Sequence, residues 1–207
     1  MSDKSIDQIM ALAPVIPVIV IDRVEDAVPM AEALVAGGLP VLEVTLRTPA
    51  ALAAIEAMKA VPGAVVGAGT VLDPAMLAGA IHAGAEFIVS PGLTDNLGKV
   101  AVASGIPFLP GTANAGDIMR GMDLGLSHFK FFPAATSGGI PALKALAGPF
   151  GQARFCPTGG ITAATAPEWL ALDAVLCVGG SWVVPAGPLD PARIETLARE
   201  ASALSRH

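Results

Sequence analysis

The run Val41-Leu42-Glu43-Val44-Thr45-Leu46 is almost entirely apolar or β-branched, with one charged residue inside it. Its hydrophobicity is nearly continuous, as expected for a strand that is buried on both faces of a parallel sheet. Alanine-rich segments with helical spacing flank the run, at residues 25–36 before it and at residues 49–60 after it. A strand between two such helices predicts consecutive βα units.

The same alternation continues along the chain, with strand-like runs whose starts lie 20–26 residues apart. The runs cover residues 15–21, 41–46, 64–71, 87–90, 107–110, 128–132, 154–157 and 174–178. Eight strands that alternate with helices predict an α/β fold, the (β/α)8 TIM barrel, near the lower size limit of that fold. An open doubly wound sheet is the alternative, although no G-x-G-x-x-G motif follows the first strand. We expect an extra N-terminal helix within residues 1–12 and a single domain over residues 1–207.

The composition argues against several classes of protein. Hydrophobic residues make up 53% of the 207 residues and charged residues 14%, whereas about 25% of a globular chain is usually charged. Part of the surface is therefore expected to be buried in an oligomer. The longest apolar stretches, such as residues 15–21, are far shorter than the ~20 residues of a membrane span, so no membrane contact is expected. The net charge of −6 and the lack of a basic run give no support for nucleic-acid binding.

Residues with versatile chemistry are few. Cys156 and Cys177 are too few for a disulfide framework and lack metal-ligand spacing. With only three histidines in the chain, a histidine-rich metal site is not expected, and no cofactor is predicted. The absence of tyrosine excludes a mechanism that needs a phenolic proton shuttle. Residues 1–12 carry no signal-length apolar core, so a cytoplasmic location is expected.

In a barrel, active sites form at the C-terminal ends of the strands and in the loops that follow them. The polar residues at these positions are Glu43, Thr45, Arg47, Thr48, Thr70, Ser90, Asn114, Lys130, Thr158 and Ser181. Lys130 differs from the other four lysines because it lies in a central strand, between Phe129 and Phe131. Lysine is almost never fully buried unless it is paired. Lys130 could be half of a structural ion pair, or an exposed lysine if the strand is misplaced. The alternative is an amine that burial keeps uncharged, able to attack a carbonyl and form a Schiff base.

Glu43 is the second unusual residue. Period-two alternation places Glu43 and Thr45 on one face of their strand and Leu42 and Val44 on the other. The apolar face would meet the helices, so Glu43 would point into the barrel, with Lys130 as its expected partner. The pair could be a structural bridge, but buried bridges stabilise weakly compared with packed apolar residues. An amine beside a carboxylate instead favours Schiff-base proton transfers.

Glycine pairs end the last two predicted strands, in Thr158-Gly159-Gly160 and Gly179-Gly180-Ser181. The loops after strands 7 and 8 of a barrel commonly bind phosphate through backbone N–H groups. Each pair could be only a tight turn, but two pairs at both expected strands favour a phosphate site.

Six motifs together resemble the 2-keto-3-deoxy-6-phosphogluconate (KDPG) aldolase and 4-hydroxy-2-oxoglutarate (KHG) aldolase family. They are Leu42-Glu43-Val44-Thr45-Leu46-Arg47-Thr48, Gly67-Ala68-Gly69-Thr70-Val71, Ser90-Pro91-Gly92, Phe129-Lys130-Phe131-Phe132-Pro133-Ala134, Cys156-Pro157-Thr158-Gly159-Gly160 and Gly179-Gly180-Ser181-Trp182. The resemblance implies a class I, metal-independent aldolase in a homotrimer of barrels. It implies cleavage of KDPG to pyruvate and D-glyceraldehyde 3-phosphate in the Entner-Doudoroff pathway, and of 4-hydroxy-2-oxoglutarate to pyruvate and glyoxylate.

Carried over motif by motif, the resemblance implies that Lys130 forms the Schiff base and that Glu43 is the general acid/base. It implies substrate contacts from Arg47, Thr70 and Pro91 at the pyruvate end, from Thr158 at the hydroxyls, and from Gly159, Gly160, Gly180 and Ser181 at the phosphate. The threonine before the glycine pair is more similar to the phosphogluconate enzymes than to the phosphogalactonate enzymes. Two alternatives are a phosphate-binding barrel isomerase or synthase, which would not need Lys130, and a catalytically silent sugar-phosphate-binding barrel.

Overall fold

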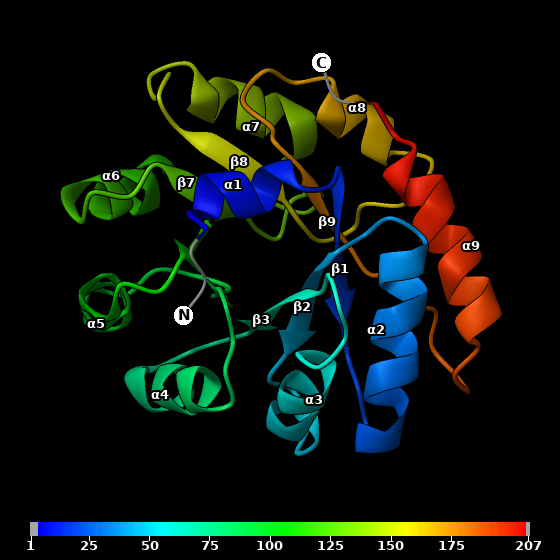
Figure 1. Cartoon of the computed structure of the whole chain (residues 1–207). Coiled ribbons are helices and arrows are strands. Elements are labelled where there is room, and N and C mark those ends of the chain that lie inside the picture. The colour runs from blue at the N-terminus through cyan, green and yellow to red at the C-terminus, as the bar shows by residue number, and fades with distance from the viewer. Residues whose placement is uncertain (1–3, 206–207) are drawn as a thin grey trace.

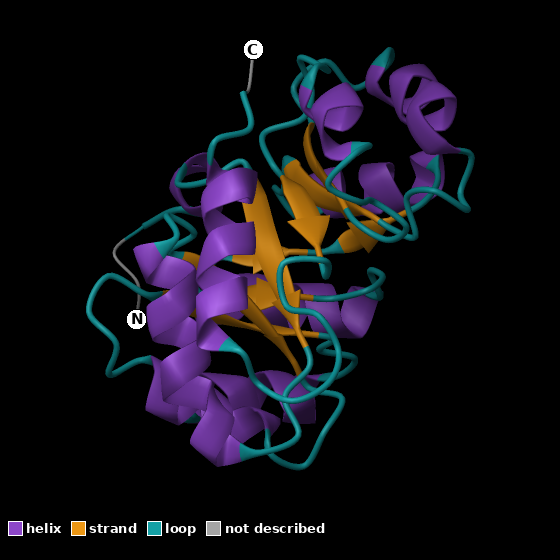
Figure 2. Ribbon diagram, turned by 90° about the vertical axis from the view of Figure 1, so that its right-hand side faces the viewer, coloured by secondary structure: helices purple, strands orange, loops and turns teal. Residues whose placement is uncertain are grey.

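The computed structural model describes residues 4–205, which form an α/β fold in which parallel strands build a curled sheet. The strands are β1 (Val15–Ile19), β2 (Val41–Thr45), β3 (Val65–Gly69), β4 (Ile88–Val89), β5 (Phe108–Leu109), β6 (Gly111–Thr112), β7 (His128–Phe131), β8 (Arg154–Pro157) and β9 (Val178–Gly180). The helices are α1 (Ile6–Ala11), α2 (Ala27–Ala36), α3 (Ala51–Met58), α4 (Pro74–His82), α5 (Asp95–Ser104), α6 (Ala115–Asp123), α7 (Gly139–Ala147), α8 (Ala166–Leu170) and α9 (Pro191–Ser202), with a short 3-10 turn at Val24–Asp26 before α2. Helices lie around the outside of the strands (Figures 1 and 2).

The strands form two groups that meet at both edges. One group has the order β5-β4-β3-β2-β1-β9 and the other the order β6-β7-β8, and every pair is parallel. Pro110 alone separates β5 from β6, because it has no backbone N–H to give to the ladder. At the other edge, an isolated parallel bridge joins Thr158, after β8, to Gly179 of β9.

The last predicted strand is displaced in the structure. Residues 174–178 were expected to form it, but β9 occupies Val178–Gly180. Val175 makes only an isolated bridge to Phe155, and its N–H closes a turn by donating to the Leu172 carbonyl at 2.8 Å. Pairing with β1 begins only at Val178, opposite Val15. The prediction failed because the apolar run ends where the strand begins, and glycine supplies two of the three strand residues.

Side chains at the helix starts explain where several helices begin. Asp73 and Thr94, residue types that favour N-caps, accept hydrogen bonds from the N–H groups of Met76 and Leu97 and so start α4 and α5. The helix expected over residues 25–36 begins at Ala27 instead, because a 3-10 turn precedes it. The helix expected over residues 49–60 is shorter, at Ala51–Met58.

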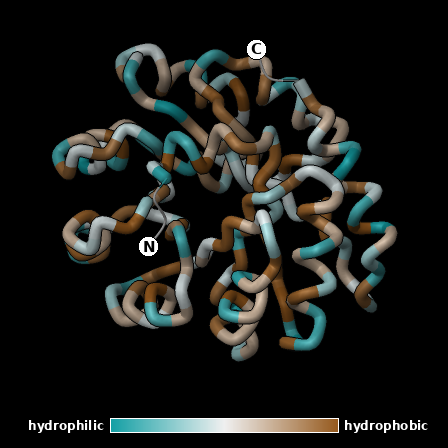
Figure 3. The backbone as a smooth tube through the Cα atoms, viewed as in Figure 1, coloured by the Kyte–Doolittle hydropathy of each residue, from teal (hydrophilic) through white to brown (hydrophobic). Residues whose placement is uncertain are grey.

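The core has two layers. Between the strands and the surrounding helices lie buried side chains such as Leu42, Val44 and Phe131. Inside the curl lies a second cluster, in which Val41 and Phe87 pack with Ile9 and Met10 of α1. Hydrophobic residues accordingly recur in both strands and helices along the backbone (Figure 3).

Helix α1 covers the N-terminal ends of the strands. Ser5 starts it with a capping box, and Ile9 and Met10 are fully buried against inward side chains near the strand starts. Burying each of these two side chains contributes about 1.5–3 kcal/mol. Helix α1 lies within the range 1–12 in which an extra helix was expected; residues 1–3 of that range, and 206–207 of the expected domain, lie outside the described residues.

Candidate active site

The centre of the site is a buried ion pair between two distant strands. Lys130 Nζ of β7 donates to Glu43 Oε1 of β2 across 2.9 Å, and the two side chains are 7% and 4% exposed. Leu42 and Val44 pack in the outer layer, so Glu43 points inward as its alternation predicts. Phe132, just after β7, lies with its ring centroid 5.4 Å from Lys130 Nζ. An amine and a carboxylate are thus held in contact and away from bulk water.

The β2 strand holds Glu43 rigidly. Its neighbour Thr45 is fully buried and donates from Oγ1 to the Ile19 carbonyl at 2.8 Å. Just beyond the strand, Thr48 donates to the Ile21 carbonyl, which ties the β2 loop to the end of β1. Arg47 lies between these anchors with an exposed side chain, and its guanidinium forms no ion pair with any described residue from 4 to 205. An unpaired guanidinium at the mouth is suited to bind a carboxylate.

Thr70 follows β3 in a strained conformation. Its φ of 58° lies in the left-handed region, and within residues 4–205 it is the one non-glycine residue with a positive φ. A β-branched residue in this region costs about 1–3 kcal/mol, and such strain gathers at functional sites. The strain therefore supports the expectation that Thr70 contacts substrate.

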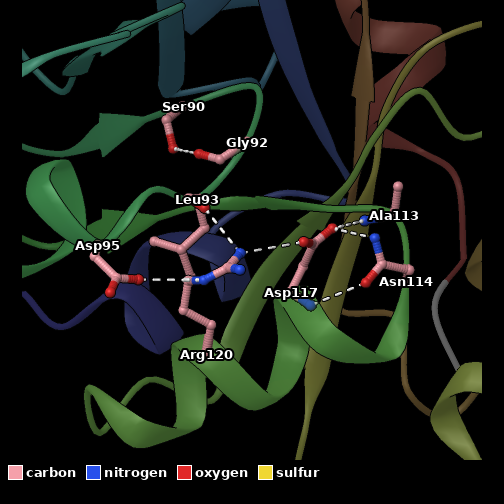
Figure 4. Close-up of polar contacts among 8 residues, drawn as sticks. All are labelled: Ser90, Gly92, Leu93, Asp95, Ala113, Asn114, Asp117 and Arg120. Carbon is pink, nitrogen blue, oxygen red and sulfur yellow. Dashed lines mark hydrogen bonds and ion pairs between the residues drawn. The ribbon is translucent and has the colours of Figure 1, made fainter.

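Pro91, half-buried after β4, lies in a loop that polar contacts hold on both sides (Figure 4). Ser90 Oγ donates to the Gly92 carbonyl at 2.7 Å. Arg120 of α6 then fixes the next turn, since its Nη1 donates to the Leu93 carbonyl at 3.2 Å and its Nε lies 3.2 Å from an Asp95 carboxylate oxygen. These contacts hold the loop that carries Pro91, the residue expected to line the site, in a fixed position.

The two glycine pairs lie on adjacent strand ends. Gly159 and Gly160 have φ values of 101° and 75°, which a side chain would disfavour. Gly160 also packs closely on Ala135, because a Cβ at Gly160 would lie 2.6 Å from the Ala135 Cβ. Gly180 lies inside β9, and Ser181 follows it with an exposed side chain. The bridge from Thr158 to Gly179 brings these two loops side by side.

Thr158 is buried where the two loops meet. It is 5% exposed, and its Oγ1 donates to the Cys156 carbonyl at 3.3 Å. It lies two residues along β8 from Cys156, which is the register partner of Lys130. Thr158 therefore follows the strand that pairs with β7 at Lys130 and directly precedes the glycine pair Gly159-Gly160.

Asn114 and His128 have structural roles. Asn114 accepts a hydrogen bond from the Asp117 N–H as the N-cap of α6. His128 begins β7, where its Nε2 lies 3.0 Å from an Asp7 carboxylate oxygen of α1, far along the strand from the mouth. The sequence motif did not single out Phe132, rather than Phe131, as the ring beside Lys130. Alternation along β7 offered that signal, because residues 128, 130 and 132 share a face.

Within residues 4–205, no group of three or more His, Cys, Asp or Glu side chains is placed to hold a metal ion. No helix in this part is both long and apolar enough to cross a membrane.

Fold and site together define a class: an α/β lyase that works as a class I aldolase, through a Schiff base. The model of the family described as "KDPG and KHG aldolase" matches residues 6–199. The chain belongs to the KDPG and KHG aldolase family.

Individual relatives agree with this assignment. The chain is 64% identical over 203 residues to the 2-dehydro-3-deoxy-phosphogluconate aldolase of Zymomonas mobilis, covering 98% of each chain. A crystal structure of the Zymomonas mobilis ZM4 enzyme with 3-phosphoglycerate has a TM-score of 0.96 and 65% identity, covering 97% of this chain and 96% of the other. The Legionella pneumophila KDPG aldolase, with pyruvate captured as a covalent carbinolamine, has a TM-score of 0.92 and 46% identity, covering 98% and 100%.

Proposed function

We propose that this aldolase cleaves KDPG to pyruvate and D-glyceraldehyde 3-phosphate, as in the Entner-Doudoroff pathway, and that 4-hydroxy-2-oxoglutarate is a second substrate. The observation that carries the proposal is the buried contact of 2.9 Å between Lys130 Nζ and Glu43 Oε1. The family membership and the 3-phosphoglycerate in the Zymomonas mobilis structure support a phosphorylated keto acid as substrate.

In the proposed mechanism, the Lys130 amine attacks the C2 ketone, and water leaves to form a protonated imine. Glu43, acting through a water molecule, removes the proton of the C4 hydroxyl. The C3–C4 bond then breaks, its electron pair forms an enamine with the imine carbon, and the aldehyde departs. Glu43 returns the proton to C3, and hydrolysis of the imine releases pyruvate and frees Lys130. The chain has no tyrosine, so this carboxylate carries the proton transfers.

The remaining predicted contacts follow the substrate outward from Lys130. Arg47 and Thr70 bind the carboxylate of the pyruvate portion, and Pro91 forms the adjoining wall. Thr158 contacts the hydroxyls. The backbone at Gly159, Gly160 and Gly180, with Ser181, binds the phosphate. The exposed guanidinium of Arg47, the strained φ of Thr70 and the positive φ values of the first two glycines support this arrangement.

For the architecture, we infer a closed (β/α)8 barrel with an extra N-terminal helix as one domain over residues 1–207. The hydrogen bond of 2.8 Å from the Lys130 N–H to the Pro110 carbonyl, and the bridge from Thr158 to Gly179, support closure at both seams. We also infer a homotrimer, which the low charge content and exposed apolar side chains such as Leu72 (55% exposed) support. Light scattering in solution measures the number of subunits directly. The buried free thiol of Cys156 suits a cytoplasmic location, where thiols stay reduced.

Borohydride trapping tests the Schiff base. The protein is incubated with pyruvate and borohydride, and mass spectrometry locates the adduct, which we expect on Lys130. Lys144→Ala, which removes an exposed helical lysine, is the matched control and should still be trapped. Trapping on another lysine, or full cleavage activity in Lys130→Ala, would contradict the proposal. An absence of any adduct would instead favour an isomerase or a catalytically silent binding barrel.

A second comparison tests the phosphate site. We expect kcat/KM for KDPG to exceed that for the unphosphorylated 2-keto-3-deoxygluconate, because only the phosphate can use the glycine loops. Equal values for the two substrates would count against the site formed by Gly159, Gly160 and Ser181.

A further inference from the structure

Two glycines of β3 face the inside of the curl next to the ion pair. In the β2–β3 ladder Glu43 is opposite Gly67, and Thr45 is opposite Gly69. The Glu43 side chain leans along its strand toward the mouth and lies over Gly69, one inward position beyond its register partner. A Cβ at Gly69 would lie 2.4 Å from Glu43 Oε1 and 2.7 Å from its Cγ. Oε1 is the same oxygen that accepts the hydrogen bond from Lys130.

Backbone conformation does not explain glycine at this position. Gly69 is absent from the glycines with positive φ, so its backbone angles do not demand glycine. The backbone also has no freedom to retreat, because the Gly69 carbonyl accepts the Leu46 N–H at 2.8 Å. A side chain at position 69 would therefore have to displace the carboxylate.

We propose that Gly69 is a positioning residue, whose missing side chain leaves the space that lets the Glu43 carboxylate reach Lys130. This inference rests on the proposed function, since it gives Gly69 its effect through the acid/base that serves the imine. A methyl group at position 69 moves Oε1 off the amine and misaligns the proton transfer. Imine formation itself, which needs the Lys130 amine and the C2 ketone, is affected less.

Gly67→Ala is the matched control for overpacking. A Cβ there would lie 2.4 Å from the Phe87 ring, which belongs to the inner core, and Glu43 is not among its three nearest neighbours. Both variants add one methyl group to an inward position of the same strand. They differ in whether that methyl meets a packing residue or the carboxylate.

The test uses pyruvate alone, which we expect the wild-type enzyme to bind reversibly as an imine and an enamine. This cycle exchanges the C3 protons and needs no phosphate. Exchange of the pyruvate methyl protons in D2O, followed by NMR, reports proton transfer to and from C3. Borohydride trapping of the same samples reports the fraction of imine. For Gly69→Ala we expect exchange per trapped imine to fall about 100-fold, the effect of a 1 Å misplacement. Gly67→Ala should keep the wild-type ratio although it lowers the midpoint of unfolding.

Several results would overturn the proposal. One is a folded Gly69→Ala protein with the wild-type exchange ratio; another is a loss of similar size in Gly67→Ala. If Gly69→Ala does not fold, the same substitution is made in a Glu43→Ala background, where it should cause little further loss of stability because the carboxylate that it would meet is gone. A double variant much less stable than Glu43→Ala alone refutes the steric account. A wild-type enzyme that neither traps pyruvate nor exchanges its protons would refute the proposed function instead.

Discussion

Replacement of Glu43 by glutamine separates the charge of this side chain from its shape. The variant keeps nearly the same volume over Gly69 and within reach of Lys130, which lies 2.9 Å from Oε1 in the native pair. It loses the negative charge and the ability to take up a proton. Stability and turnover should therefore both fall, for different reasons that two measurements separate.

The size of both effects follows from burial. The side chains of Glu43 and Lys130 are 4% and 7% exposed, and removing one partner of a buried pair costs about 3–5 kcal/mol. Loss of a general acid/base lowers turnover by about 10²–10⁴-fold, which is about 2.7–5.4 kcal/mol at 1.36 kcal/mol per decade. Glu25→Gln is the control, because its pair with Arg23 spans 3.7 Å and is mostly exposed. It should cost less than about 1 kcal/mol.

Urea unfolding measures the first effect, and pyruvate release in a coupled assay measures the second. Borohydride trapping should still detect some imine in Glu43→Gln, because Lys130 remains. Normal turnover in this variant would remove Glu43 from the mechanism. A stability loss no larger than that of Glu25→Gln would show that the pair is not buried in solution as it is in the structure.

Three further variants test the surroundings of the pair. Thr70→Gly relieves about 1–3 kcal/mol of backbone strain and loses about 0.5–1 kcal/mol to chain entropy. The urea midpoint of unfolding should therefore rise while kcat/KM falls, and unchanged activity would mean that the strain at Thr70 has no role in the site. Arg120→Ala releases the Leu93 turn and should raise KM severalfold, with a stability loss below about 1 kcal/mol because its pair with Asp95 is largely exposed. An unchanged KM would show that the loop keeps its conformation without Arg120. Asp73→Ala removes the cap of α4 and should cost about 1 kcal/mol in urea unfolding without changing kcat, and a changed kcat would place α4 in the active machinery.

The residues that could be predicted from the sequence are those whose type conflicts with burial. Lys130 and Glu43 interrupt apolar strands, and that conflict, together with the alternation of side chains along β2, predicted that Glu43 points inward and pairs with Lys130. Two-residue alternation was sufficient because a strand buried on both faces has only an inner and an outer side.

Features that depend on how neighbouring strands pair could not be predicted from residue type and alternation. The apolar run at 174–178 has good strand composition, yet the ladder with β1 starts at Val178, and pairing decides the strand. Gly69 likewise lies in a motif, Gly67-Ala68-Gly69-Thr70-Val71, whose composition gives no sign of a contact with Glu43. Its role depends on how far the Glu43 side chain leans along the sheet, which only coordinates show.

Helix α1 has a consequence for the order of events in a turnover. Ile9 and Met10 fill the end of the curl at which the strands begin. We therefore expect both products to leave through the opposite end, where the substrate enters. In the proposed mechanism, the pyruvate portion is still covalently bound to Lys130 when the carbon–carbon bond breaks, whereas the aldehyde is not covalently bound. We therefore expect ordered release, with the aldehyde leaving first and pyruvate last. In the direction of synthesis, we expect pyruvate to bind before the aldehyde. Pyruvate should accordingly inhibit cleavage competitively, and the aldehyde should not.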